Sequence, residues 1–145
     1  MDSLNIMFRS KKWENDVYSK VQNKNPNDII IEEIADYDIY LGIMWKYFGT
    51  PTGEYKSGTE QEFRVALKNY DAIGKPAIKF YFSKRKIETD DIDVNQLINV
   101  KEFEEELKTK GVLKYYDSLE KFRYMIFKEL SECLKDEYKI LNGME

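Results

Sequence analysis

Histidine is absent from this chain of 145 residues, and cysteine occurs once, at position 133. The chain alone can therefore form no Ser-His-Asp triad, no Cys-His dyad and no histidine-ligated metal site. The single Cys133 also excludes an intrachain disulfide and a four-cysteine zinc site, and it favours a reducing, cytoplasmic setting. We expect no metal, and any acid–base chemistry must come from Asp, Glu, Lys, Tyr or the substrate.

Long apolar runs are lacking as well. No stretch approaches the roughly eighteen residues of a membrane span, and the N-terminal residues lack the order of a secretory signal. The 23 basic and 27 acidic residues are interspersed and give a net charge of −4, unlike the concentrated positive charge of a duplex nucleic-acid binder. We therefore expect neither a membrane nor duplex nucleic acid as a partner. The one basic run, Ser83–Lys86, follows a predicted strand; a solvated loop is its commoner explanation and a phosphate site the rarer one.

Apolar residues make up 42% of the chain, which is enough for one folded domain over residues 1–145. The expected strands are residues 4–8, 37–44, 77–82 and 113–116, and the expected helices run from 60 to 72, from 93 or 95 to 110, and from Ser118 onward. Residues 10–27 are predicted to form a polar loop, and residues 28–35 fit either a short helix or, through Ile29–Ile31, a strand. This alternation predicts a parallel sheet with right-handed crossovers.

Apolar stripes support two of these helices. The first carries Phe63, Ala66, Leu67 and Tyr70 at helical spacing, and the last carries Leu119, Phe122, Ile126, Leu130, Cys133 and Leu134. Cys133 is therefore expected to be a core thiol and not a nucleophile.

A long loop, residues 45–58, follows the apolar strand 37–44. Parallel sheets bind ligands beyond the carboxyl ends of their strands, and loops of this length in compact domains are usually functional or disordered. We therefore expect the ligand site at this loop and at the helix start that follows it.

Four segments carry a recognisable pattern: Trp13–Asp16, Asp38–Thr52, Ser57–Phe63 and Gly74–Phe82. They resemble a bacterial family of domains of unknown function, number 4062, with a TIR-like fold, often found N-terminal to NACHT and other STAND ATPases. Residues 100–130 also resemble the C-terminal part of that family, so the resemblance covers nearly the whole chain. It implies a three-layer, flavodoxin-like α/β domain with helices on both faces of a parallel sheet.

The resemblance also implies a function: a nucleotide-binding effector or sensor domain in bacterial antiviral defence. NAD or a related nucleotide would be the substrate, cleaved at the nicotinamide–ribose bond, and no resident cofactor is expected. The alternative is a non-catalytic oligomerisation or protein-interaction module. Domains of this kind normally begin with a strand, a Ser/Thr-rich turn and a long helix, whereas this sequence starts near their second strand. A sheet edge left uncovered in this way favours pairing with another chain, so we expect a homo-oligomer.

Glu62 is the candidate catalytic residue. The stretch Thr59–Glu62 resembles the helix start of nucleoside deoxyribosyltransferases and of NAD-cleaving TIR enzymes, in which a glutamate four residues before a small residue, here Ala66, acts on the ribose. A carboxylate beside the sugar stabilises oxocarbenium charge, and nicotinamide leaves without a histidine acid. The alternative is a capping box, with Thr59 as the N-cap and Glu62 reaching back to its amide.

The predicted ligand-binding residues are Trp13, Trp45, Phe48, Gly49, Thr50, Thr52, Ser57, Gly58 and Thr59. Trp45 could stack on a base or on nicotinamide, and the amides at the helix start could hold a phosphate. Ordinary structural roles explain the same residues: a tryptophan that packs a loop, and a turn with a helix cap.

Overall fold

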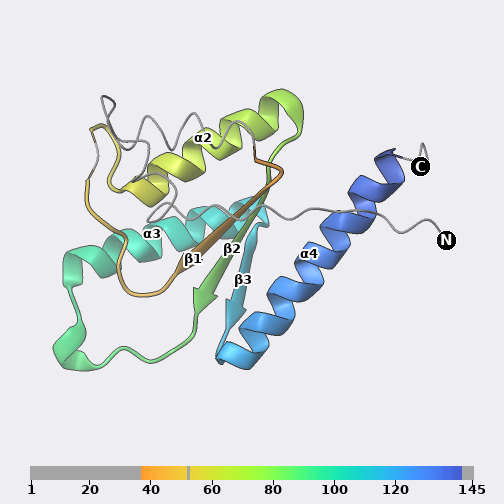
Figure 1. Cartoon of the computed structure of the whole chain (residues 1–145). Coiled ribbons are helices and arrows are strands. Elements are labelled where there is room, and N and C mark those ends of the chain that lie inside the picture. The colour runs from red at the N-terminus through yellow and green to blue at the C-terminus, as the bar shows by residue number, and fades with distance from the viewer. Residues whose placement is uncertain (1–36, 52, 142–145) are drawn as a thin grey trace, which may run out of the picture. The chain divides into compact units, whose positions relative to one another are not determined.

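The computed structural model describes residues 37–51 and 53–141 (Figure 1). Its elements are β1 (Ile39–Met44), α2 (Gly58–Ile73), β2 (Ala77–Ser83), a short 3₁₀ helix η3 (Thr89–Asp91), α3 (Val94–Lys110), β3 (Leu113–Tyr116) and α4 (Leu119–Leu141). Every strand and helix that the sequence predicts between residues 37 and 141 is confirmed, with ends shifted by no more than a few residues. The strand expected at 4–8, the loop at 10–27 and the segment 28–35 lie outside the described residues.

The strands form one sheet in the order β1-β2-β3. β2 and β3 run parallel, with Phe80 opposite Leu113 and Ser83 opposite Tyr116. Backbone hydrogen bonds hold both ends of this pair: the Phe80 amide donates to the Val112 carbonyl (2.8 Å), and the Lys84 amide donates to the Tyr116 carbonyl (2.7 Å). The arrangement is an α/β fold with a flavodoxin-like layout, as the sequence predicts.

The described residues fall into two compact units. Of the described residues, one unit comprises residues 37–40 and Gly49–Ile78, and it contains α2. Phe63 and Ala66 of the expected α2 stripe are buried, whereas Tyr70 is 49% exposed. The other unit comprises Leu41–Phe48 and the chain from Lys79 onward, and it contains α3, β3 and α4.

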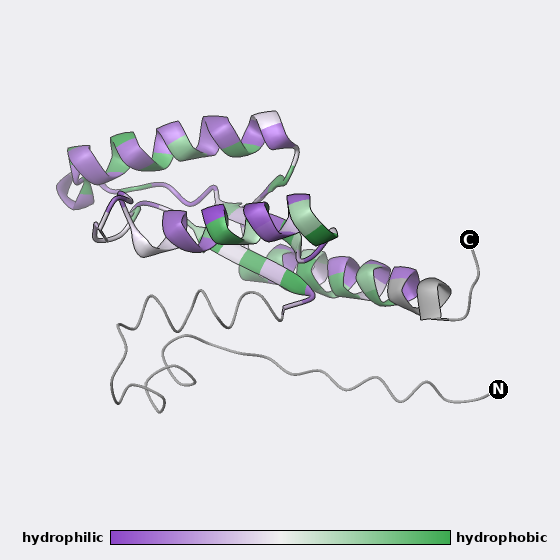
Figure 2. Ribbon diagram, turned by 90° about the horizontal axis from the view of Figure 1, so that it is seen from above, coloured by the Kyte–Doolittle hydropathy of each residue, from purple (hydrophilic) through white to green (hydrophobic). Residues whose placement is uncertain are grey.

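Consecutive residues of β2 show how α3 and α4 are placed. The Phe80 ring meets the edge of Phe103 on α3 (5.3 Å between centroids), and the Tyr81 ring meets Phe122 on α4 (5.8 Å). Because neighbouring residues of a strand point to opposite faces, α3 and α4 cover opposite faces of the sheet. This unit therefore has the expected three layers. Figure 2 shows hydrophilic and hydrophobic residues interspersed along both helices.

Capping residues set the ends of α3 and the start of α4, as the sequence predicts. The Asp93 carboxylate accepts the Gln96 amide (3.1 Å), and Gly111 ends α3 in the left-handed region at φ 68°. The Ser118 hydroxyl oxygen accepts the Lys121 amide at the start of α4 (3.2 Å). Leu119 lies in that first turn and is 62% exposed, so the expected apolar stripe begins at Phe122. Among the described residues, no helix is both long and apolar enough to cross a membrane.

Gly42 on β1 allows the sheet to pack closely against α3. A Cβ atom at this position would lie 2.2 Å from the Phe80 ring, far inside van der Waals contact. The same face continues through Phe103, whose ring also meets the edge of Phe48 (5.3 Å). All three phenylalanines are buried, so this cluster has no free space for another methyl group.

We expect Gly42→Ala to destabilise the protein by about 1–3 kcal/mol, because the added methyl group overpacks the Phe80 ring. Replacing Phe80 with Ala should cost about 3–5 kcal/mol through lost burial and the resulting cavity. Urea unfolding of the two single variants and the double variant measures the coupling between the sites. In the double variant the alanine at 42 should destabilise the protein little, because the Phe80 ring that its methyl group would overlap is absent.

The matched control is Gly58→Ala, since a Cβ atom there meets open space. Its free energy of unfolding should change by about half a kcal/mol or less. If the alanine at 42 lowers the free energy of unfolding equally with and without the Phe80 ring, the two residues do not compete for the same space.

Candidate functional site

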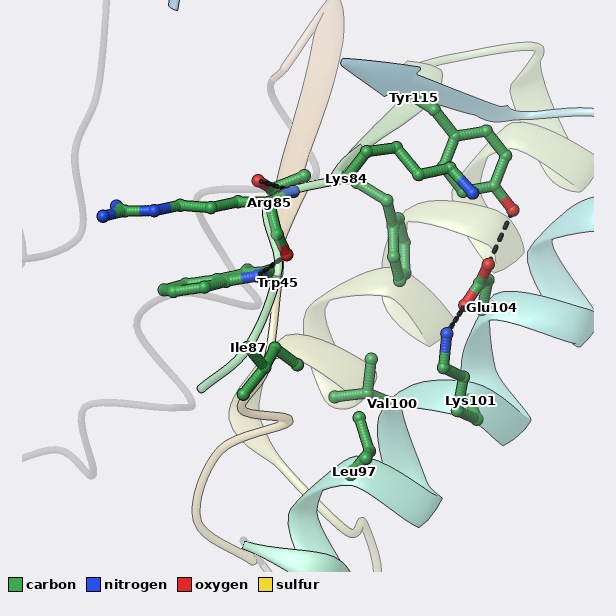
Figure 3. Close-up of a pocket in the computed structure, with 11 residues that line it drawn as sticks. Trp45, Lys84, Arg85, Ile87, Leu97, Val100, Lys101, Glu104 and Tyr115 are labelled. Carbon is green, nitrogen blue, oxygen red and sulfur yellow. Dashed lines mark hydrogen bonds and ion pairs between the residues drawn. The ribbon is translucent and has the colours of Figure 1, made fainter. Parts of the chain in front are cut away.

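A pocket lies at the carboxyl ends of the three strands, within the unit that contains α3 and α4. Its volume is about 150 Å³. The strand ends and the segments after them contribute Trp45, Phe82, Ser83, Lys84, Arg85, Ile87 and Tyr115, and α3 contributes Leu97, Val100, Lys101 and Glu104. Figure 3 shows Trp45 and Arg85 along one side and Tyr115, Glu104 and Lys101 along the other.

The Trp45 indole is fixed by a hydrogen bond and flanked by cations. Its Nε1–H donates to the Arg85 carbonyl (2.9 Å). The Arg85 guanidinium lies 5.3 Å from the centroid of the indole, and the Lys46 ammonium lies 4.6 Å from it. Both distances are within the range of cation–π attraction, so the two cations help to hold the indole in place.

The opposite wall is organised around the buried carboxylate of Glu104. The Tyr115 hydroxyl donates to it (2.7 Å), and the Lys101 ammonium donates as well (3.2 Å). Burial alone would raise the pKa of Glu104, but these hydrogen bonds and the charges of Lys101 and Lys108 lower that pKa below its ordinary value. Burial, followed by the hydrogen bond to Glu104, raises the pKa of Tyr115.

Lys84 completes this wall, with its ammonium 4.0 Å from the centroid of the Tyr115 ring. Within the described part of the chain, neither Lys84 nor Arg85 forms an ion pair with a carboxylate. Three cations and one carboxylate therefore line the pocket, an excess of two positive charges. Such a site attracts anions.

Glu62 lies in the other unit, where it accepts a hydrogen bond from the Tyr40 hydroxyl (3.2 Å). Burial raises the pKa of Glu62 above its ordinary value, and the hydrogen bond from Tyr40 opposes that rise only in part. Burial and the Glu62 carboxylate also raise the pKa of Tyr40. Glu62 is therefore a shielded carboxylate, and among the residues that the structure describes its donor is the neutral Tyr40 hydroxyl.

The prediction that Thr59 caps this helix is wrong. α2 begins at Gly58, and its N-cap is Ser57, whose hydroxyl oxygen accepts the Glu60 amide (3.1 Å). Two overlapping Ser/Thr-x-x-Glu frames exist here, and the structure uses the earlier one, in which Ser57 is extended (φ −161°, ψ 163°) and fully buried. Glu62 consequently lies beyond the capping positions, so capping does not explain it.

The family model for DUF4062, described as a domain of unknown function, matches residues 7–131. The chain belongs to this family. The match spans the pocket, Tyr40 and Glu62, and it confirms the family that the sequence motifs indicate. Neither a curated protein nor a solved structure matches the chain.

Of the predicted ligand-binding residues of this DUF4062 domain, Trp45 lines the pocket and Phe48 does not. Phe48 is buried in the aromatic cluster, and its amide donates to Gln96 Oε1 (2.7 Å). Gly49 lies beside Ser57: a Cβ atom on it would be 3.2 Å from the serine Cβ. Thr50 is exposed, Gly58 and Thr59 occupy the first turn of α2, and Trp13 and Thr52 lie outside the described residues. Ligand binding by these residues stays a prediction.

Sequence reasoning missed Lys101, Glu104 and Tyr115 as pocket residues. Lys84 and Arg85 belong to the basic run that the sequence shows, for which a solvated loop is the commoner explanation and a phosphate site the rarer one; the structure places both residues in the pocket lining. Their position directly after β2, at the carboxyl end of a parallel strand, was the signal that distinguishes them from an ordinary basic loop. Lys86, the last residue of the run, does not line the pocket.

The raised pKa of Glu62 predicts how stability depends on pH. The folded state binds the Glu62 proton more tightly than the unfolded state, so the resulting stabilisation is complete below the unfolded value near 4.5 and is lost as pH rises through the folded pKa. Glu62→Gln stays neutral and keeps an acceptor for Tyr40. We expect its melting temperature to equal that of wild type at pH 4 and to exceed that of wild type at pH 7.

Thermal unfolding followed by circular dichroism across this range measures the difference. Glu60→Gln, in the first turn of the same helix, is the control and should follow the pH dependence of wild type. Parallel melting curves for Glu62→Gln and wild type at every pH would contradict the shielded state of Glu62.

Proposed function

We propose that this DUF4062 domain is a TIR-like nucleotide-binding module, with its ligand site in the pocket at the strand ends. The observation that carries this proposal is the pairing, in one pocket, of a fixed indole with an excess of positive charge. Parallel α/β sheets bind nucleotides at this edge. A nucleotide presents a planar base that stacks on aromatic or guanidinium surfaces and a phosphate that binds cations.

A separate part of the proposal concerns Glu62, which lies in the other unit and not in the pocket: catalysis at the bond between a ribose and nicotinamide, with NAD as the substrate that the family resemblance implies. Its support is chemical: Glu62 is released from a capping role, is shielded from water, and keeps a second carboxylate oxygen that does not accept from Tyr40. A shielded carboxylate stabilises oxocarbenium charge more strongly than one in water. A role as an effector or sensor in bacterial antiviral defence completes the proposal and rests on the resemblance alone, and the cytoplasmic setting rests on the single cysteine.

Nucleotide binding and NAD turnover by the purified chain test this function. Trp45→Ala should weaken binding by tenfold or more, because stacking on an aromatic ring contributes about 1–3 kcal/mol per base. If NAD is cleaved, Glu62→Gln should reduce turnover on the order of a hundredfold, because it removes the charge that faces the transition state.

The control for turnover is again Glu60→Gln, which should leave it unchanged. Unchanged turnover in Glu62→Gln would assign catalysis elsewhere. Absence of turnover in the parent chain would reject the catalytic part, and absence of nucleotide binding would reject the function as a whole.

A second candidate function, self-association, is favoured by the outer surface of α4. Leu119, Tyr124 and Phe127 are 62%, 66% and 72% exposed. Residues 119–128 of this helix contain three cations and one carboxylate, whereas residues 130–136 contain two carboxylates, Glu132 and Asp136, and one lysine. A second copy related by a two-fold axis would align α4 antiparallel and place opposite charges together. We therefore propose a homodimer through α4.

Sedimentation velocity over a range of protein concentrations tests this candidate. Phe127→Ser should weaken the dimer by tenfold or more, because it removes an exposed aromatic ring from the interface. The control is Ile98→Ser, which alters a residue of α3 that is 50% exposed and should leave association unchanged. A monomer at high protein concentration would reject self-association.

A further inference from the structure

We infer that the pocket at the strand ends is built for a terminal phosphate monoester, so that its ligand is a mononucleotide and not an intact dinucleotide. This inference rests on the proposed nucleotide-binding function and narrows it to one ligand class. Two independent features of the pocket carry it: its charge and its size.

Charge is the first feature. The pocket holds the cations Lys84, Arg85 and Lys101 and the carboxylate Glu104, so two positive charges are left without compensation in its walls. A phosphate monoester carries about −1.5 to −2 at neutral pH on a single phosphorus centre. Each phosphate within a pyrophosphate bridge carries roughly one negative charge, and the two centres are separated. A compact dianion therefore matches the pocket better.

The cations are held in place before a ligand arrives. Glu104 binds the Lys101 ammonium (3.2 Å) and the Tyr115 hydroxyl (2.7 Å), and the Tyr115 ring in turn lies under the Lys84 ammonium (4.0 Å). One buried carboxylate thus positions two lysines and limits their mutual repulsion. In Figure 3 Trp45 and Arg85 lie on the other side of the pocket, with their side chains extending side by side away from this charged wall. A phosphate on the charged wall would leave the base of the same nucleotide directed toward the indole.

Size is the second feature. A volume of about 150 Å³ is well below the roughly 300–1,000 Å³ of sites that enclose drug-sized ligands. A phosphate with part of its sugar fits such a space, with the base at the rim. A pyrophosphate joined to two nucleosides would leave at least one whole nucleoside outside this space.

Isothermal titration calorimetry with matched ligands tests the inference. The probes are the four common ribonucleoside 5′-monophosphates and nicotinamide mononucleotide, each compared with its nucleoside and its 5′-methylphosphate, together with NAD. We expect at least one monophosphate to bind tenfold or more tightly than its nucleoside, its methylphosphate and NAD. Its affinity should fall below about pH 6, where a monoester gains a proton, while that of the methylphosphate should not.

Lys84→Gln should weaken binding of that monophosphate by tenfold or more, because a charge-assisted contact to the phosphate is lost. Lys86→Gln is the control: it makes the same change in net charge two residues away, at an exposed residue that does not line the pocket, and should alter affinity less than twofold. Thermal melts verify that both variants fold.

The outcomes separate the two levels of proposal. NAD or a methylphosphate binding as tightly as the monophosphates would overturn this inference and leave the nucleotide-binding function standing. Equal losses in Lys84→Gln and Lys86→Gln would also overturn it, because a general electrostatic effect would then explain the affinity. No binding by any nucleotide would overturn the inference and the function together.

Discussion

The close contact between Gly42 and the Phe80 ring is the constraint on which the packing of the sheet depends. The ring occupies the space where any other residue at position 42 would carry a Cβ atom. This lets Phe80 reach the edge of Phe103 on α3, and Phe103 reach Phe48 in the segment that follows β1. A strand, a helix and a loop segment are thus joined through three buried rings and one missing side chain. The dense packing of such a cluster leaves little freedom to shift α3 along the sheet.

The pocket follows from that packing. Parallel strands end at the same edge, and the bond from the Lys84 amide to the Tyr116 carbonyl extends the β2–β3 pairing to the last residue of β3. Lys84 and Arg85 therefore leave the sheet next to Tyr115. Because α3 is fixed by Phe103, the residue that follows it, Glu104, faces Tyr115 at hydrogen-bonding distance. The charged wall of the pocket is consequently an extension of the aromatic core.

Local sequence signals were sufficient for the elements but not for the site. Apolar periodicity and the caps Asp93, Gly111 and Ser118 located α3, β3 and the start of α4 because each signal acts within a few residues. The cap of α2 was placed two residues late because Ser57 and Thr59 head equally good capping frames, and only tertiary burial of Ser57 distinguishes them. Trp45 was found from its position after a strand. The pocket residues on α3 were not, since contacts such as Glu104 with Tyr115 depend on the register between helix and sheet.

Two shielded glutamates show how the same side chain acquires different chemistry. Glu104 receives hydrogen bonds from a tyrosine and a lysine and lies near a second lysine, so its pKa falls despite burial and it stays ionised. Glu62 receives one hydrogen bond from the neutral Tyr40, so burial dominates and its pKa rises. An ionised, fully compensated carboxylate is suited to positioning neighbouring cations. A carboxylate with a weakly compensated charge can gain stabilisation from a positive charge that develops next to it, and this is the property that an oxocarbenium transition state requires. The electrostatic environment of Glu104 thus suits it to a structural role, and that of Glu62 is compatible with the catalytic role proposed for it.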